Sequence, residues 1–549
     1  MKNKLQTQKS GEGAEAGGTA RQPRNAVWPI LLRAVALAVI VLVICVRVRL
    51  LDVPLERDEG EYAYTGQLIL QGIPPFRLSS NMKLPGTDAA YALCMAAFGQ
   101  TAAGVHAGLL IVNLGAITLL FFLGRRLFGE TAGWVASASY ALLAVGMGVL
   151  GTSAHATHFV ALPALAATLL LLRWNDSHRM ATLFWSGLLY GLAVIMKQPG
   201  ALFAAFGALD LLWTERRHLR SGWRSVLLRF GVFALAGCLP LAVTCLILWR
   251  AGVFPRFWFW TVTYGRAYGS IIPLAGAVQV LFRNIPRVIS ANWALWILGG
   301  AGLALAWIRK PTRASALFAT VFLAFSFLAV CPGFYFREHY FILMLPALAL
   351  LAGAAVAAAG DRLSGALAVM IFAGVVAISV IPQRYFYFRM PNTELSRRLY
   401  GPNPFPEAVA VGDYIKNHSA RDARVAVLGS EPEIYFYAQR HSATDYIYTY
   451  ALVEPQPYAL PMQDEMIRDI EAANPEYIVA VNVTTSWLFQ ATSPARIFNW
   501  FADYGPKHYD LVGVVDIVST ATTVYQWDSA AVGYQPRSPY FLRIFKRRS

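Results

Sequence analysis

Long apolar runs recur from Val27 to Ile381, and they leave few folds open to this chain. Of its 549 residues, 56% are hydrophobic and only 14% are charged, whereas charged residues make up about 25% of an average soluble protein. Many runs approach the ~20 apolar residues that a helix needs to cross a bilayer. The sequence therefore predicts a polytopic α-helical membrane protein with about 11 to 13 spans. The clearest segments are 28–46, 105–124, 131–151, 156–173, 180–196, 199–213, 225–249, 291–308, 314–331, 340–358 and 363–381.

The two ends of the chain differ from this apolar part. Residues 1–25 have no apolar core and are predicted to form a disordered cytoplasmic tail. Residues 26–381 are expected to form the transmembrane domain, with an outer loop at 50–104 that contains an apolar, interfacial or re-entrant stretch at 88–99. Residues 382–549 alternate between helical and strand patterns, which predicts an extracytoplasmic α/β domain. Its helices are expected at 406–418, 431–440, 461–473 and 494–504, and its strands at 424–429, 476–483 and 511–518.

Basic residues occur in every second short loop between the apolar segments, and such an excess of Lys and Arg is typical of cytoplasmic loops. Their parity predicts a cytoplasmic N-terminus and places residues 382–549 on the periplasmic side of the cell's inner membrane. Arg47 and Arg49 depart from the rule. The net charge of +16 is interpreted in the same way, with membrane lipids rather than nucleic acid as its partners. The basic loops contain Arg125, Arg126, Arg173, Arg179, Arg216, Arg217, Arg220, Arg224, Arg309, Lys310, Arg313 and Arg362.

An acidic cluster of Asp58, Glu59 and Glu61 follows the first apolar segment. Carboxylates beside a membrane are costly to bury and mark functional sites. The pattern from 58 to 71 predicts an amphipathic helix that stops at Gly72, and Asp58 and Glu61 share a face of it because they are three residues apart. The cluster is interpreted as a general base in an outward-facing cavity. The alternative is a solvated turn at the membrane interface.

Three basic residues on the same side of the predicted topology are candidates for binding an anion. Lys83 lies in a Lys-Leu-Pro-Gly turn, Lys197 precedes Gln-Pro-Gly between two apolar segments, and Arg337 begins the tenth segment. A cation flanked by apolar helices is suited to binding a phosphate. The alternatives are a snorkelling Lys83, a Lys197 that only separates two helices, and an ion pair between Arg337 and Glu338.

His155 and His158 are three residues apart at the outer start of a predicted helix. A pair with this spacing can bind a metal ion, but histidines are common at helix ends and the sequence offers no obvious third ligand. The five cysteines are scattered, without a Cys-x-x-Cys motif. The sequence therefore predicts no metal site, while it leaves a divalent metal cofactor open.

An ordered set of motifs resembles the GT-C superfamily of glycosyltransferases. It consists of Asp58-Glu59-x-x-Tyr62-Ala63, Gln71-Gly72-x-Pro74, Lys83-x-Pro85 with Tyr91, Lys197-x-Pro199-Gly200, and His339-Tyr340 before Leu345-Pro346-Ala347-Leu348. The set is most similar to the dolichyl-phosphate-mannose protein mannosyltransferases and the aminoarabinose transferases that modify lipid A. The chain departs from them in having Lys-Leu-Pro-Gly instead of Lys-Pro-Pro, and in having Asp88 at a usually apolar or aromatic position. No family motif covers residues 382–549.

The resemblance implies a GT-C fold and a transferase that takes a hexose or pentose from a polyprenyl-phosphate donor on the outer side of the membrane. It implies that Asp58 is the catalytic aspartate and Glu59 its neighbouring acid, and that Lys83 and Lys197 lie near the donor phosphate. Arg337 is a further candidate for the phosphate. The candidate substrate contacts are Glu61, Tyr62, His155, His158, His339 and Tyr340.

The implied chemistry is a single displacement with inversion. A carboxylate deprotonates the acceptor, which is expected to be a lipid, a glycan or a protein, and a cation stabilises the departing phosphate. The alternatives are a transporter or flippase of lipid-linked glycans, and a non-catalytic binding protein of the same fold. A transporter is disfavoured because the charges cluster at segment ends and no internal repeat is evident.

Overall fold

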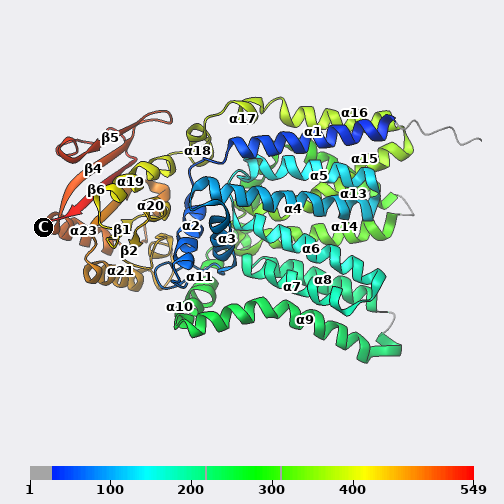
Figure 1. The fold of residues 1–549 in the computed structure, drawn as a ribbon, viewed down its shortest axis with the longest axis horizontal. Helices are drawn as coiled ribbons and strands as arrows, with labels where there is room; N and C mark the ends of the chain where they lie inside the picture. The colour runs from blue at the N-terminus through cyan, green and yellow to red at the C-terminus, as the bar shows by residue number, and fades with distance from the viewer. Residues whose placement is uncertain (1–26, 217–218, 309–311, 549) are drawn as a thin grey trace, which may run out of the picture.

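The computed structural model describes residues 27–216, 219–308 and 312–548, which form a long helical bundle with a sheet domain at one end (Figure 1). The tail predicted at 1–25 lies outside the described residues. The bundle consists of α1 (Val27–Arg49), α4 (Ala102–Phe128), α5 (Glu130–Val145), α6 (Ala156–Ser177), α7 (Met180–Met196), α8 (Gly200–Glu215), α9 (Leu219–Arg250), α13 (Trp293–Ile308), α14 (Arg313–Val330), α15 (Leu345–Arg362) and α16 (Gly365–Val380). Every apolar segment predicted from the sequence thus corresponds to one of these helices.

Six helices within the described ranges are long and apolar enough to cross a membrane. The number rises to seven if α12 (Leu274–Ser290) and α13, which meet at an angle of 106°, count as one span. α7 and α16 are apolar but shorter. The predicted polytopic helical fold is confirmed, while the predicted 11 to 13 spans include helices below the ~20 residues that a bilayer requires.

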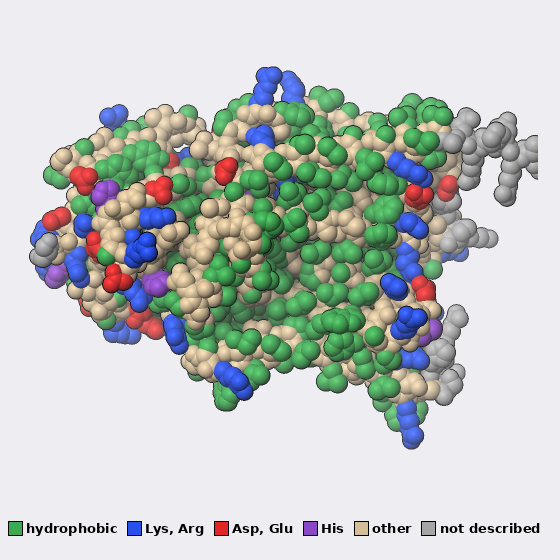
Figure 2. Space-filling model, in the orientation of Figure 1, with side chains coloured by type: hydrophobic (Ala, Val, Ile, Leu, Met, Phe, Trp, Pro, Cys, Tyr) green, Lys and Arg blue, Asp and Glu red, His purple; other side chains and the backbone are tan. Residues whose placement is uncertain are grey.

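The surface of the bundle supports the same conclusion. Figure 2 shows hydrophobic side chains along its flank, while charged side chains gather on the sheet domain and at the opposite end of the bundle. Arg125 and Arg126 lie in the last turn of α4, and Arg362 lies in the last turn of α15. An apolar belt between two charged ends is what a bilayer-spanning protein requires.

The sheet domain is a six-stranded mixed sheet in the order β2-β1-β3-β6-β4-β5. β1 pairs in parallel with β2 and β3, whereas β6 is antiparallel to β3 and β4, and β4 is antiparallel to β5. The predicted α/β class is confirmed. The strands are β1 (Arg424–Leu428), β2 (His441–Ser442), β3 (Tyr477–Asn482), β4 (Tyr509–Ile517), β5 (Thr523–Trp527) and β6 (Phe541–Arg547), and the helices are α19 (Phe405–His418), α20 (Glu433–Ala438), α21 (Ala459–Ala473), α22 (Thr484–Trp487) and α23 (Arg496–His508).

Two helices of the predicted outer loop, α2 (Arg57–Leu70) and α3 (Gly86–Phe98), lie between the bundle and the sheet domain (Figure 1). α2 begins with a capping box, in which the side chains of Glu56 and Glu59 each accept the backbone N–H of the other. A Cβ at Gly60 would lie 2.6 Å from the backbone nitrogen of Glu433, so only glycine allows α2 to approach α20 this closely. The first turn of α2 is therefore fixed against the sheet domain.

The remaining helices connect these parts. α17 (Arg384–Phe388) and α18 (Asn392–Tyr400) lead from the bundle to the sheet domain, and α10 (Phe254–Trp258), a π-helical turn (Phe259–Tyr264) and α11 (Gly265–Gly269) follow α9. Tyr62 and Tyr64 of α2 share one buried core with Val427 and Ile434 of the sheet domain. Short 3-10 turns occur at Met147–Val149, Pro332–Phe334, Glu338–Leu343, Tyr450–Leu452 and Asp528–Ala530.

Candidate active site

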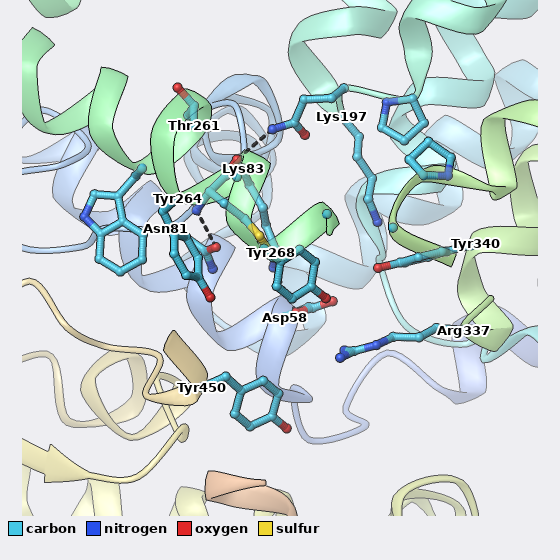
Figure 3. Close-up of a pocket in the computed structure, with 18 of the residues that line it drawn as sticks. Asp58, Asn81, Lys83, Lys197, Thr261, Tyr264, Tyr268, Arg337, Tyr340 and Tyr450 are labelled. Carbon is cyan, nitrogen blue, oxygen red and sulfur yellow. Dashed lines mark hydrogen bonds and ion pairs between the residues drawn. The ribbon is translucent and has the colours of Figure 1, made fainter. Parts of the chain in front are cut away.

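A cavity of about 240 Å³ lies where the bundle, α2 and the sheet domain meet (Figure 3). Its walls come from α2, the turn before α3, the α7–α8 connection, the segment before α15 and the sheet domain. The structure thus brings together side chains that are far apart in the sequence. Six residues that the sequence analysis singled out line it, namely Asp58, Lys83, Lys197, Arg337, His339 and Tyr340.

Asp58 is held beside a lysine and a second acid. The Lys83 ammonium lies 2.9 Å from Asp58 Oδ1 and 2.7 Å from Glu61 Oε2. Burial on its own raises the pKa of Asp58, but Lys83, with further contributions from His339 and His155, holds that pKa well below its usual range. Burial lowers the pKa of Lys83, yet the two carboxylates raise it well above its usual value. Asp58 is therefore ionised and Lys83 protonated at neutral pH.

Lys83 is committed to these carboxylates and does not snorkel at an interface. Its ammonium also lies 4.5 Å from the ring centroid of Tyr62 and 5.5 Å from that of Tyr448. Tyr62 and Glu61, both predicted substrate contacts, are buried, contact Lys83 and do not line the cavity. Lys83, Glu61 and Tyr62 therefore serve to orient the Asp58 carboxylate and to keep it ionised.

Replacing Lys83 by Met is expected to move the acidic limb of the pH–kcat profile to higher pH. Without the ammonium, Asp58 and Glu61 are two neighbouring buried carboxyl groups, so the pKa of Asp58 rises and the ionised base is lost at a higher pH than in the wild type. Lys83→Arg, which keeps the charge, should shift the limb less. An unchanged acidic limb in Lys83→Met would contradict this role.

Lys197 and Arg337 are the uncommitted cations of the cavity. Within the described parts of the chain neither has a carboxylate at ion-pair distance; instead Lys197 Nζ lies 4.3 Å from the Tyr340 ring centroid, and Arg337 stacks at 5.5 Å on Tyr335. The alternative pairing of Arg337 with Glu338 is not formed, because Glu338 lies 3.6 Å from Arg287. Burial, with smaller contributions from Lys83 and Arg337, lowers the pKa of Lys197 to about 7. Both cations are available to an anionic ligand.

Glu59 lies outside the cavity lining and has structural contacts. Its carboxylate lies 2.9 Å from His106 Nε2 and accepts the backbone N–H of Ala154 at 2.5 Å, in addition to closing the capping box. The side chain is fully buried. Glu59 therefore ties the first turn of α2 to α4 and to the segment before α6, and it contacts neither Asp58 nor the cavity directly.

The histidines form a small buried cluster beside Asp58. The rings of His155 and His339 stack with centroids 4.2 Å apart, and His339 Nε2 lies 3.9 Å from Asp58 Oδ2. Burial lowers the pKa of His155 to about 4 and that of His339 well below its usual value, so both are neutral. His158 is buried in α6 and is not part of the cavity lining.

Asp58, His155 and His339 are also the one group of potential metal ligands in the part of the chain that the structure describes. Their ligand atoms lie within 4.8 Å of one another, and the group contains His155 but not His158, the other member of the pair considered from the sequence. A carboxylate with two imidazoles is a donor set that transition metals accept. However, Asp58 already pairs with Lys83, so a metal ion bound to Asp58 would be repelled by the Lys83 ammonium. We assign no metal to this group.

The aromatic side chains of the cavity lining were not predicted from the sequence. They are Trp260, Tyr264, Tyr268, Tyr448 and Tyr450, and the lining also contains Glu454. The alternating tyrosines at 446, 448 and 450 and the aromatic-rich stretch 254–268 were visible signals. Neither signal shows on its own that these rings line a cavity, because the rings come from two parts of the chain that meet only in the fold.

Arg57 was missed as well. Its guanidinium donates to the Ser430 carbonyl at 2.5 Å, Tyr450 Oη at 2.7 Å and Asn403 Oδ1 at 2.8 Å, and lies 3.2 Å from Glu431 Oε1. The buried guanidinium of Arg57, the residue before Asp58, thus connects the first turn of α2 to the part of the cavity wall that the sheet domain contributes.

Comparisons with known proteins agree with this architecture. Residues 83–243 match the profile of the family described as dolichyl-phosphate-mannose-protein mannosyltransferase. The chain is similar to ArnT from Cupriavidus metallidurans in its apo state, with a TM-score of 0.55 and 17% identity over 94% of this chain and 98% of that one. The same protein bound to undecaprenyl phosphate gives a TM-score of 0.55 and 16% identity, over 95% and 98%. No curated protein sequence matches the chain.

A further similar structure is the archaeal oligosaccharyltransferase AglB from Archaeoglobus fulgidus, in complex with an inhibitory peptide and a dolichol-phosphate. Its TM-score is 0.50, with 14% identity over 90% of this chain and 74% of that one. Identities this low show the fold alone. With the profile match, they support a GT-C superfamily member of the branch that contains the protein mannosyltransferases and ArnT. The general kind of protein that these comparisons support is a membrane glycosyltransferase.

Proposed function

We propose that the protein transfers a sugar from a polyprenyl-phosphate donor to an acceptor at the extracytoplasmic face of the membrane, with inversion at the anomeric carbon. The observation that carries the proposal is that an ionised Asp58 and two uncommitted cations, Lys197 and Arg337, line one cavity. The cavity lies at the end of the bundle that adjoins the sheet domain (Figure 3). A transporter would favour a binding site near the middle of its spans.

Asp58 is proposed to be the general base. The acceptor hydroxyl or amine loses its proton to the Asp58 carboxylate while its oxygen or nitrogen forms a bond to the anomeric carbon. The bond from that carbon to the phosphate oxygen breaks, and its electron pair stays on the phosphate. One attack from the face opposite the leaving group inverts the centre. Glu59 and Lys83 act through Asp58, the first by fixing the turn and the second by keeping the carboxylate ionised.

Lys197 and Arg337 are proposed to bind the donor phosphate. Charge accumulates on the phosphate as it departs, and cations in a site with little water stabilise that charge most effectively. Arg337 offers a planar fork and Lys197 a point charge, so together they hold and neutralise the group. Lys83 is left out of this role because Asp58 and Glu61 already occupy its ammonium.

The orientation that we propose is based on the basic end of the bundle. If Arg125, Arg126 and Arg362 lie in the cytoplasm, as basic residues at segment ends favour, the cavity and the sheet domain are on the periplasmic side. A polyprenyl-phosphate sugar displayed on the outer leaflet then reaches the cavity from the bilayer.

The proposed function is tested by mass spectrometry of lipid-linked sugars and envelope glycans from cells with and without the protein. We expect one polyprenyl-phosphate sugar to accumulate, and one glycan or lipid to lose a sugar residue, when the protein is absent. Restoring the wild-type protein should reverse both changes. Identical profiles in the two strains would contradict a transferase.

Because burial lowers the pKa of Lys197 to about 7, the use of the donor is expected to depend on pH. Lys197 is charged below that pH and neutral above it, so kcat/KM for the donor should fall by up to ~10-fold per pH unit as the pH rises above about 7. The measurement is kcat/KM for the donor from about pH 6 to 9. Lys197→Arg, charged throughout, should flatten this limb, and the same fall in Lys197→Arg would exclude Lys197 as its source.

A further inference from the structure

Besides Asp58, the described cavity lining contains a second carboxylate, and it belongs to the sheet domain. Glu454 follows the 3-10 turn Tyr450–Leu452 and is only 7% exposed. Tyr264, which comes from the segment after α9, donates its hydroxyl to Glu454 Oε2 at 2.5 Å. Both residues line the cavity. The sheet domain therefore contributes a polar group to the cavity as well as covering it.

Only one of the two oxygens of the Glu454 carboxylate accepts a hydrogen bond within the described residues. Glu454 Oε1 has no hydrogen-bond partner among the described residues, while Oε2 is fixed by Tyr264. Oε1 is not among the fully enclosed polar atoms that lack a partner, so it is accessible from the cavity, where a ligand can donate to it. Arg337 is close enough to lower the pKa of Glu454, although burial raises it more. The free oxygen thus belongs to the same cavity as the cations proposed for the phosphate.

Aromatic faces adjoin this acid. Tyr264 and Trp260 meet at 5.1 Å between ring centroids, and Tyr268 stacks on Tyr335 at 4.7 Å with an interplanar angle of 15°. Apolar faces next to a few well-placed polar groups are typical of small-molecule sites. A ligand that presents C–H groups to rings and hydroxyls to a carboxylate is a carbohydrate ring. A phosphate would be repelled by Glu454, so this side is unsuited to the charged part of the donor.

We propose that Glu454 and Tyr264 form a carbohydrate subsite, in which Glu454 accepts hydrogen bonds from ring hydroxyls and thereby selects the sugar. This inference rests on the proposed function, because it assumes that a sugar enters the cavity. Its ring could be the sugar that is transferred or a sugar of the acceptor, and the two share the same recognition chemistry. Glu454 is then a specificity-determining residue, and Asp58 remains the base.

The position of Glu454 is itself fixed from α2. Its backbone N–H donates to the Tyr450 carbonyl at 2.9 Å, and Arg57 holds the Tyr450 hydroxyl at 2.7 Å. Tyr450 in turn donates to the Thr485 carbonyl at 2.6 Å. The subsite and the first turn that carries Asp58 are therefore joined through three hydrogen-bonded residues, which suits a site where the sugar must be held in register with the base.

The test uses the full chain reconstituted in liposomes. The liposomes receive total lipid extract and acceptor from cells that produce the protein. Mass spectrometry then identifies the polyprenyl-phosphate sugar that the wild type consumes. With that donor purified, KM and kcat are measured for donor and acceptor. Glu454→Gln is expected to raise one KM by about 10- to 100-fold, the usual effect of losing a charge-assisted hydrogen bond, and to lower kcat less. Tyr264→Phe, which releases Oε2, should raise the same KM by a smaller factor.

Each outcome of these measurements either supports or contradicts the subsite. A rise in KM for the donor assigns the subsite to the transferred sugar, and a rise in KM for the acceptor assigns it to the acceptor. Glu465→Gln is the matched control, because Tyr446 donates to Glu465 at the same 2.5 Å but Glu465 does not line the cavity; it should leave both constants unchanged. Wild-type constants in Glu454→Gln would overturn the subsite and leave the transferase intact. No donor consumed by the wild type would overturn both.

Discussion

Replacing Asp58 by Asn should lower kcat by about 10²- to 10⁴-fold while the protein still folds. The amide keeps the size of the side chain but cannot take a proton from the acceptor. Glu61 stays within 2.7 Å of Lys83, so the ammonium keeps a partner and the fold loses little. The measurement is single-turnover transfer from a polyprenyl-phosphate sugar by the purified variant, with thermal unfolding as the check on folding.

Asp88→Asn is the matched control for this prediction. Asp88 lies in the first turn of α3, where burial, with a contribution from Glu61, raises its pKa well above its usual value. An amide at this position keeps the size of the side chain. It does not line the cavity. We expect near wild-type turnover in Asp88→Asn, and full activity in Asp58→Asn would refute the assignment of the base.

Replacing Arg57 by Met should lower the free energy of unfolding by about 3 to 5 kcal/mol. The change leaves Glu431, which is fully buried, without its cation, and it removes donors to Ser430 and Tyr450. Because Tyr450 lines the cavity and precedes Glu454, transfer should fall as well. Chemical denaturation of the detergent-solubilised protein measures the first effect and steady-state kinetics the second.

Two further variants separate charge burial from general damage. Arg57→Met combined with Glu431→Gln removes both charges, so the double variant should recover part of the lost stability. Lys507→Met breaks the ion pair with Asp503, in which both side chains are more than half exposed, and should change the free energy of unfolding by less than ~1 kcal/mol. Equal losses in Arg57→Met and Lys507→Met would mean that Arg57 does not join α2 to the sheet domain.

The fold was predictable because membrane-spanning helices appear as long apolar runs and buried strands as short apolar runs. The apolar runs located every helix of the bundle, and the buried, apolar strands β1, β3 and β4 were found from their composition. β5 and β6 were missed because much of their surface is partly exposed, and β2 because it has only two residues. The predicted domain boundary at residue 381, between the transmembrane domain and the α/β domain, stays a prediction.

The candidate site was predictable only where a motif marks it. Asp58, Lys83 and Lys197 stand in family-like motifs, and all three line the cavity. The partner of each group could not be read from the sequence, because contacts between α2 and the sheet domain join residues more than 350 positions apart. Lys83 was expected at a phosphate because the sequence did not reveal that the turn before α3 folds back onto Asp58 and Glu61, which lie only 25 and 22 positions away. Glu454 was missed because its partner Tyr264 lies 190 positions away in the sequence.

The most direct test of the central claim is to incubate purified wild-type protein with a polyprenyl-phosphate sugar and its acceptor and to determine both products by mass spectrometry and NMR. We expect free polyprenyl phosphate, one sugar added to the acceptor for each phosphate released, and an anomeric configuration opposite to that of the donor. Donor that crosses the liposome membrane unchanged, with no sugar transferred, would contradict it.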